Sequence, residues 1–338
     1  MSLISVNLGS GAYLSLLGIV LFISIYFLKI NFCYKYYFLL PLVLISSLIG
    51  LSHYGDVKFS NIAGFCISLS PFFLFKNISD DVLYKIIQAI KITIILHLLF
   101  FWFQVLSYYL ISIHFDFLGM IGAKARNFDG SREILGFRVF RGSGLYEEPS
   151  TFAAAITILC ISIRQRISKV LIIICSFSCF ISMSTFGFIS GAFLFIYIIE
   201  SSGLKIKIAA ILSALLFFPT IYLYQYNRLF NGHEGDYNAI GVREFFIEHA
   251  INRDIYRQIL GEGVGTTHLD LFVNNDVGGA FLIYYTFGVL GLPLIFKLIS
   301  ICKFDKVAII VMFLKLPLYY PIFWFAVWCK LKIENSTK

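Results

Sequence analysis

The sequence predicts an all-α, polytopic transmembrane protein with about ten spanning helices and two larger extracytoplasmic segments, forming a single integral membrane domain over residues 1–338. Of these residues 59% are hydrophobic and only 14% are charged, whereas a soluble domain carries about 25% charged residues. The apolar residues also fall in runs that approach the roughly 20 residues a spanning helix needs. This composition excludes a soluble enzyme, a nucleic-acid-binding module and a disordered chain.

The expected spans are apolar runs separated by charged or polar residues: Ala12–Leu28, Tyr37–Leu51, Phe59–Phe75, Ile92–Ile113, Thr151–Ile163, Ile208–Tyr224, Ala280–Phe296 and Val307–Trp328. The apolar stretch between Lys169 and Glu200 would be about 45 Å long as one helix, which exceeds a bilayer core of about 30 Å. We therefore expect two short helices there, with a turn near Met183–Gly187. Because Lys315 and two prolines interrupt the last run, it either crosses once or is broken or re-entrant.

The basic residues predict an orientation. With ten spans, the lysines and arginines of the short loops all fall on one side, which is then cytoplasmic. The net charge of +8 is explained by this topology signal rather than by a nucleic-acid partner. The longer segments 114–150 and 225–278 then face outward, unless the stretch between Lys169 and Glu200 crosses only once. The first apolar run has no Lys or Arg before it, so we expect a retained span rather than a cleaved signal peptide.

Arginine and lysine are distributed differently along the chain. Eight of the ten arginines lie in the two long segments, against one of the seventeen lysines. A topology signal would use either residue, so this bias favours a site for bidentate capture of phosphate or carboxylate by guanidinium groups. The alternative is a solvated loop that happens to be rich in arginine.

The first segment ends in a motif that runs from Arg138 to Thr151 and leads directly into an expected span. Pro149 suits the first turn of a helix, and Glu147 and Glu148 precede it at the positive end of the helix dipole. Gly142 and Gly144 would let the backbone approach a ligand closely. Acidic capping of a helix explains the glutamates alone, but it does not explain Arg138 and Arg141, which we expect to be functional because they lie near membrane depth.

The second segment predicts a helix from Ile240 to Leu260 with Arg243 near its start. Isoleucines recur every four residues from Ile247 to Ile259, and His249, Arg253 and Arg257 recur on the opposite side. A helix lying on the membrane surface explains Arg253 and Arg257 as well as a ligand site does. The turn from Gly261 to Gly265 could present its N–H groups to an anion.

Polar residues also precede the span at Ala280. Asp276 suits a helix N-cap, or it could hold an arginine or a sugar hydroxyl. His268 is the one outer histidine that a span closely follows, whereas His97 lies within an apolar run and is expected to be packed and hydrogen-bonded rather than catalytic.

Taken in order, these pieces resemble the O-antigen polymerase and ligase superfamily, bacterial inner-membrane glycosyltransferases that use lipid-linked sugars. The resemblance rests on the Arg141–Ser150 motif, on Ser184–Gly187, on Arg243 with Gly261–Gly265, and on Asn275-Asp276 with Gly288 and Gly291. The ligase branch carries a His-Asn pair where this chain has Asn274-Asn275-Asp276, which favours the polymerase branch. A ligase, and a transporter or flippase of lipid-linked oligosaccharide, remain as alternatives.

The resemblance implies polymerisation of undecaprenyl-pyrophosphate-linked oligosaccharide units at the periplasmic face of the inner membrane, without metal or cofactor. Membrane lipids and a chain-length regulator protein are the other implied partners. The resemblance assigns the leaving pyrophosphate to Arg141 and Arg243, with Arg138 and Arg257 as second choices. A base must take the proton of the acceptor hydroxyl. The candidates for this base, which the sequence does not rank, are Glu148, Glu147, His268 and Asp276.

Overall fold

The computed structural model describes residues 39–54, 59–75, 78–120, 131–134, 137–200, 239–264, 278–301 and 321–336, with residues 20, 23–25, 203, 208, 311 and 315–316. The all-α prediction is confirmed for these residues, apart from one short β-hairpin. The helices are α2 (Leu39–Tyr54), α3 (Phe59–Leu74), α4 (Asp80–Ile111), α5 (Phe117–Met120), α6 (Pro149–Ser162), α7 (Lys169–Ile181), α8 (Thr185–Glu200), α10 (Ala239–Ile251), α11 (Ile255–Leu260), α13 (Gly279–Phe287), the 3₁₀ helix η3 (Gly288–Gly291), α14 (Leu292–Ile301) and α16 (Pro321–Ser336).

Among the described residues, two helices are long and apolar enough to cross a membrane: Asp80–Ile111, and Gly279–Phe296, which combines α13, η3 and the start of α14. The prediction of about ten spans is therefore not confirmed. Three shorter apolar helices, α2, α3 and α6, coincide with the expected spans Tyr37–Leu51, Phe59–Phe75 and Thr151–Ile163. Two expected spans, Ala12–Leu28 and Ile208–Tyr224, lie almost wholly outside the described residues.

The expected turn within the apolar stretch from Lys169 to Glu200 is confirmed. Helices α7 and α8 pack against each other and are joined by a turn at residues 182–184. Close approach is possible because Gly187 and Gly191 lie one helical turn apart on α8. The hydroxyl of Ser176 on α7 donates to the carbonyl of Gly191 over 2.8 Å, so the two backbones are also linked by a hydrogen bond.

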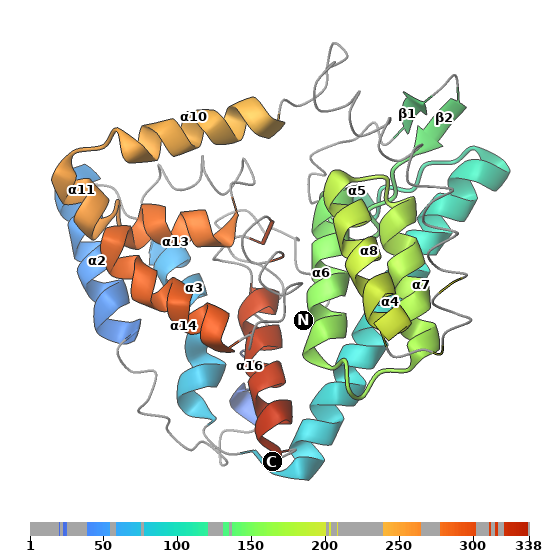
Figure 1. Cartoon of the computed structure of the whole chain (residues 1–338), viewed down its shortest axis with the longest axis horizontal. Coiled ribbons are helices and arrows are strands. Elements are labelled where there is room, and N and C mark those ends of the chain that lie inside the picture. The colour runs from blue at the N-terminus through green and yellow to red at the C-terminus, as the bar shows by residue number, and fades with distance from the viewer. Residues whose placement is uncertain are drawn as a thin grey trace.

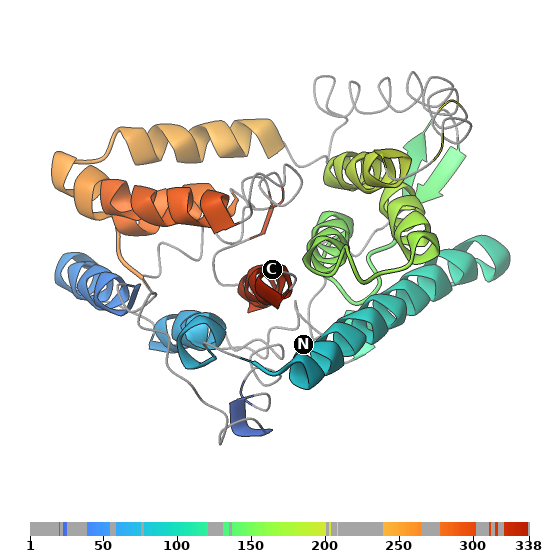
Figure 2. The ribbon, with the colours of Figure 1, turned by 60° about the horizontal axis from the view of Figure 1, so that its bottom comes forward.

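The last predicted span is broken. Lys315 and Leu316 are not helical, and α16 begins at Pro321, where a proline's missing N–H costs no helical hydrogen bond. Helix α16 occupies the centre of the molecule, between α4 and α6–α8 on one side and α2, α3, α10, α11, α13 and α14 on the other (Figures 1 and 2). It packs against α3 and α6, and Trp324 receives the rings of Phe65 and Phe72 edge-on at 5.9 and 6.2 Å.

The described parts of the two long segments lie at the same end of the molecule. The hairpin of β1 (Ser131–Ile134) and β2 (Phe137–Phe140) comes from the first segment, and α10 comes from the second; both lie at the top of Figure 1. Helix α6 begins at this end and runs to the α6–α7 turn at the opposite end, where Arg164, Arg166 and Lys169 are found. The arginine-bearing segments therefore lie away from this basic turn.

Candidate functional site

The loop from Arg141 to Glu148 connects β2 to α6 and is held against α4 by Gln104. The side-chain carbonyl of this buried glutamine accepts hydrogen bonds from the backbone N–H groups of Ser143 and Gly144, both at 2.9 Å. Its amide donates to the carbonyl of Phe115 at 2.8 Å. One side chain on α4 therefore fixes both the loop and the chain that follows α4.

The two glycines of this loop let it pack closely against α4. The sequence pattern instead predicts that they let the backbone approach a ligand. A Cβ on Gly142 would lie 2.8 Å from a methyl group of Val105 and 3.0 Å from the ring of Phe101. Gly144 has a φ of 60°, and a Cβ there would lie 3.2 Å from the backbone nitrogen of Phe101. Both positions require glycine because the loop lies directly on the helix.

Tyr146 anchors the loop in the core. It is fully buried, and its ring lies 4.7 Å from the ring of His97 on α4 and 5.9 Å from that of Phe152 on α6. Burial raises the pKa of Tyr146 well above its ordinary value, so its hydroxyl stays protonated. The expectation that His97 is packed is confirmed, since it is 0% exposed.

Of the two arginines predicted in this motif, Arg141 is buried and follows β2 directly. Arg138 lies within β2, opposite Glu133 of β1; its backbone is described but its side chain is not. The hairpin is anchored beside α4, because the N–H of Phe140 donates to the hydroxyl of Tyr109 over 3.0 Å. The structure thus places Arg141 between the hairpin and the start of α6.

Glu148 is the N-cap residue of α6 and forms an ion pair that connects distant parts of the chain. Its Oε2 lies 2.9 Å from Nζ of Lys315 and accepts a hydrogen bond from the hydroxyl of Ser150 at 3.0 Å. The side chains of Lys315 and Glu148 are 5% and 16% exposed. Glu147, the other candidate base of this loop, is half-buried beside it.

The predicted helix from Ile240 to Leu260 is interrupted between α10 and α11, and Arg253 occupies the break. Instead of facing outward, Arg253 is buried: its Nε donates to the carbonyl of Ala250 over 2.9 Å, and its Nη1 donates to Oε1 of Glu262 over 3.3 Å and to the carbonyl of Tyr285 over 3.1 Å. The guanidinium also lies 4.6 Å from the centre of the Tyr285 ring. These contacts hold Arg253 at the break between α10 and α11.

The isoleucines of this segment lie on an exposed face, as a helix lying on a membrane surface would have them. Ile247, Ile251, Ile255 and Ile259 are all exposed. Their four-residue spacing is therefore not the mark of a face that packs on the protein core. It marks an exposed apolar face along α10 and α11.

The glycine-rich turn after α11 is a packing element, and its first N–H groups are already bonded. Those of Glu262 and Gly263 donate to the carbonyls of Tyr285 and Thr286, and that of Val264 donates to the hydroxyl of Ser46. Gly261 and Gly263 have φ of 78° and 93°, and a Cβ on either would meet backbone atoms of α13 or α2. The expected presentation of these N–H groups to an anion is wrong for residues 261–264.

The remaining candidates of the second segment are only partly described. Arg243 lies in α10, and the structure describes its backbone but not its side chain. Arg257 is half-buried in the last turn of α11. His268 and Asp276 lie outside the described residues.

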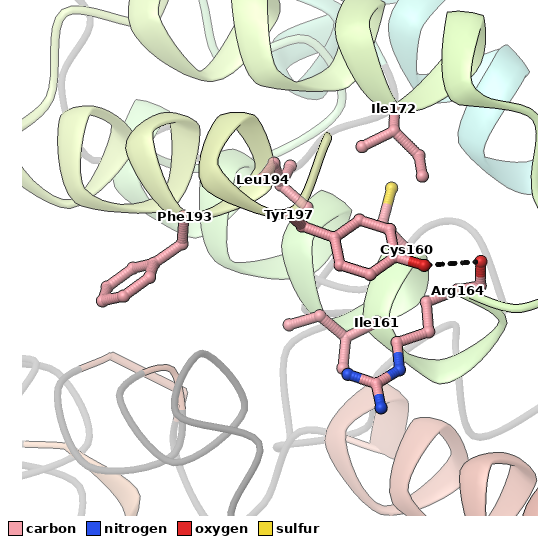
Figure 3. Close-up of a pocket in the computed structure, with 7 residues that line it drawn as sticks. All are labelled: Cys160, Ile161, Arg164, Ile172, Phe193, Leu194 and Tyr197. Carbon is pink, nitrogen blue, oxygen red and sulfur yellow. Dashed lines mark hydrogen bonds between the residues drawn. The ribbon is translucent and has the colours of Figure 1, made fainter. Parts of the chain in front are cut away.

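A small recess between α6, α7 and α8 does not belong to this site. Six of its seven lining residues are apolar or aromatic, and Arg164 is the charged one (Figure 3). The hydroxyl of Tyr197 donates to the carbonyl of Arg164 over 3.4 Å. Arg164 follows the last turn of α6 and Glu148 precedes its first, so the length of a helix of 14 residues, about 21 Å, separates the two.

Sequence reasoning missed the residues that hold the site together, chiefly Gln104, Lys315 and Glu262. The signal available for Gln104 and Lys315 was a polar side chain inside an apolar run. In the sequence, Lys315 indicates only an interruption of a span, and Glu262 only part of a glycine-rich turn. Comparison with models of known protein families, with curated proteins and with solved structures found no match.

Proposed function

We propose that this chain is a multi-pass inner-membrane glycosyltransferase that polymerises undecaprenyl-pyrophosphate-linked oligosaccharide units into O-antigen at the periplasmic face. One observation carries the proposal: the described parts of both arginine-rich segments lie at the same end of a helical bundle. Had they been at opposite ends, their arginines could not act on one substrate.

The surface of the bundle supports a membrane location. Helix α4 buries one side, yet its other side exposes an unbroken apolar row at three- and four-residue spacing: Ile92, Leu96, Leu99, Phe103, Leu106 and Leu110. Apolar rows are also exposed on α2 and α7. Soluble monomers rarely expose contiguous apolar surface of this extent, whereas lipid tails are a suitable solvent for it.

The proposed chemistry uses groups from both segments. Arg141, Arg243, Arg138 and Arg257 would stabilise the negative charge that develops on the departing diphosphate, an electrostatic role that is often the largest in such transfers. Glu148, Glu147, His268 or Asp276 would take the proton of the attacking hydroxyl. No cofactor takes part in this scheme.

The function is tested by deleting the gene in its host and analysing the lipopolysaccharide. We expect lipopolysaccharide capped with a single repeat unit. Polymer that stays on its lipid carrier, beside bare lipopolysaccharide, would instead identify an O-antigen ligase, and repeat units trapped in the inner leaflet would identify a flippase.

The site assignment is tested by complementing that strain with Arg141→Ala and Arg243→Ala. Because each substitution removes a guanidinium that would stabilise the leaving diphosphate, both should abolish polymer while the protein remains in the membrane. Lys85→Ala is the control, since this exposed lysine pairs with Asp81 one helical turn away and lies at the start of α4, far from the site. Normal polymer ladders from both arginine variants would refute the assignment.

A further inference from the structure

Lys315 is a buried cation in a stretch of sequence that otherwise reads as a span. Only 4% of the residue is exposed, and its ammonium lies 2.9 Å from the carboxylate of Glu148. A charge at such a position is expensive to bury. Stability alone does not explain it, because apolar residues of similar volume often replace buried ion pairs without loss.

The position of the pair suggests what it does. Glu148 caps α6 by its backbone position, but its carboxylate forms no side-chain cap hydrogen bond with the helix. The carboxylate is instead held by Lys315 and Ser150 and keeps some exposure. The ammonium and the positive end of the helix dipole both favour its charged form.

We propose that Lys315 is a positioning residue, which holds Glu148 ionised and oriented so that Glu148 is the base of the transfer reaction. This inference rests on the proposed function. The acceptor hydroxyl oxygen bonds to the anomeric carbon as the bond from that carbon to the diphosphate oxygen breaks. The electron pair leaves with the diphosphate, and the hydroxyl proton passes to the carboxylate of Glu148.

Other ionisable groups lie at this end of α6. The loop that precedes α6 contributes Glu147, Tyr146 and Arg141. Helix α4 contributes His97, which contacts Tyr146. Glu147 is next to Glu148 in the chain and disfavours a second negative charge there. Lys315 offsets that repulsion, because its ammonium lies 2.9 Å from the Glu148 carboxylate.

The test uses the full-length protein in proteoliposomes with a defined lipid-linked repeat unit, and measures the rate of polymer formation against pH. An opposite charge typically shifts a carboxylate's titration by about 1–3 pH units. In Lys315→Met the carboxylate therefore takes up a proton more readily, and the acidic limb of the profile should move upward by roughly that amount. In Lys315→Arg, which keeps the positive charge, the acidic limb of the profile should stay at the same pH as in the wild-type protein.

A double variant shows whether Lys315 acts through Glu148. Glu148→Gln should lower the rate by about 10²–10⁴-fold. Glu148→Gln/Lys315→Met leaves no unpaired buried charge at this pair, and it should be no slower than Glu148→Gln alone, because Lys315 has lost the group it acts on. This double variant decides the question even where Lys315→Met does not fold.

Lys330→Met is the matched control, since Lys330 is another buried lysine but lies within α16. In Lys330→Met, the acidic limb of the rate–pH profile should lie at the same pH as in the wild-type protein. An unshifted limb in folded Lys315→Met, or a double variant clearly slower than Glu148→Gln, would overturn the inference and leave the proposed function intact. A wild-type protein that forms no polymer from the repeat unit would instead defeat the proposed function itself.

Discussion

The guanidinium of Arg253 is held by protein groups from three elements. It binds the end of α10 through the carbonyl of Ala250, the glycine-rich turn through Glu262, and α13 through the carbonyl and ring of Tyr285. The Arg253 and Glu262 side chains are only 2% and 1% exposed. These contacts assign Arg253 to holding the second long segment together, and not to gripping a ligand.

Removing either partner of this pair should destabilise the protein strongly. Arg253→Met leaves the carboxylate of Glu262 buried without its cation, which costs about 3–5 kcal/mol in comparable buried pairs. Thermal unfolding in detergent measures the loss. Lys85→Met, which breaks the exposed pair with Asp81, should cost less than about 1 kcal/mol, and equal losses in the two variants would contradict the structural role of Arg253.

Gln104 should control the order of the loop that carries Arg141. Gln104→Leu leaves the N–H groups of Ser143 and Gly144 without their acceptor, at a cost of about 1–3 kcal/mol for each buried group left unsatisfied. Hydrogen exchange at these two amides should therefore quicken relative to the amides of α6. Gln88→Leu makes the same change elsewhere on α4 and should leave the exchange of these two amides unaltered.

The candidate site could be predicted where its residues share one motif, and not where they come from distant parts of the chain. Arg141 and Glu148 were found because glycines, acids and a proline lie together before an apolar run. Gln104 bonds to positions 39 and 40 residues away, and Lys315 to one 167 residues away. Sequence spacing carries no information about such contacts, which depend on how helices pack.

At the scale of elements, the α7–α8 pair depends on two glycines. A Cβ on Gly187 would lie 2.5 Å from the backbone carbonyl oxygen of Cys179 and would also overlap the hydroxyl of Ser182. Because a backbone atom cannot move aside as a flexible side chain can, the helices would have to separate. This overlap outweighs the modest gain in helix propensity from glycine to alanine.

Gly187→Ala should therefore destabilise the protein by about 1–3 kcal/mol, a usual cost of overpacking. Gly203→Ala is its control, since a Cβ there would meet nothing within 4 Å. Unfolding in detergent and protease cleavage in the turn between α7 and α8 both measure the effect. A Gly187→Ala variant as stable as Gly203→Ala would show that the two helices are not in the close contact described.

Element boundaries were predictable where hydropathy or steric rules set them. The length of the apolar stretch from Lys169 to Glu200 required a turn, and the structure has one. The break between α10 and α11 was not predictable, because the local pattern from Ile240 to Leu260 is continuous and helical. Arg253 lies at this break and bonds to Tyr285, which is 32 residues away in the chain, as well as to Glu262, which is nine residues away.

At the scale of the whole molecule, the exposed apolar rows and the end that carries the arginine-bearing segments are two separate features. Apolar side chains are exposed along α2, α4 and α7, whereas the hairpin, the Arg141–Glu148 loop and α10 gather at one end. The basic α6–α7 turn lies at the other end. Hydropathy predicts the rows, but it places both arginine-bearing segments on one side only if the apolar stretch between Lys169 and Glu200 crosses the membrane twice.

This arrangement predicts which positions face the periplasm. Cysteines introduced at Ser131 in β1 and at Glu244 in α10 should both react with a membrane-impermeant maleimide in intact spheroplasts, above the background of the parent chain. A cysteine in place of the exposed Arg166 should react only after the membrane is opened, since the positive-inside rule assigns that turn to the cytoplasm. Labelling at Ser131 without labelling at Glu244 would mean that the two segments lie on opposite sides of the bilayer, and a diphosphate could then not be shared between their arginines.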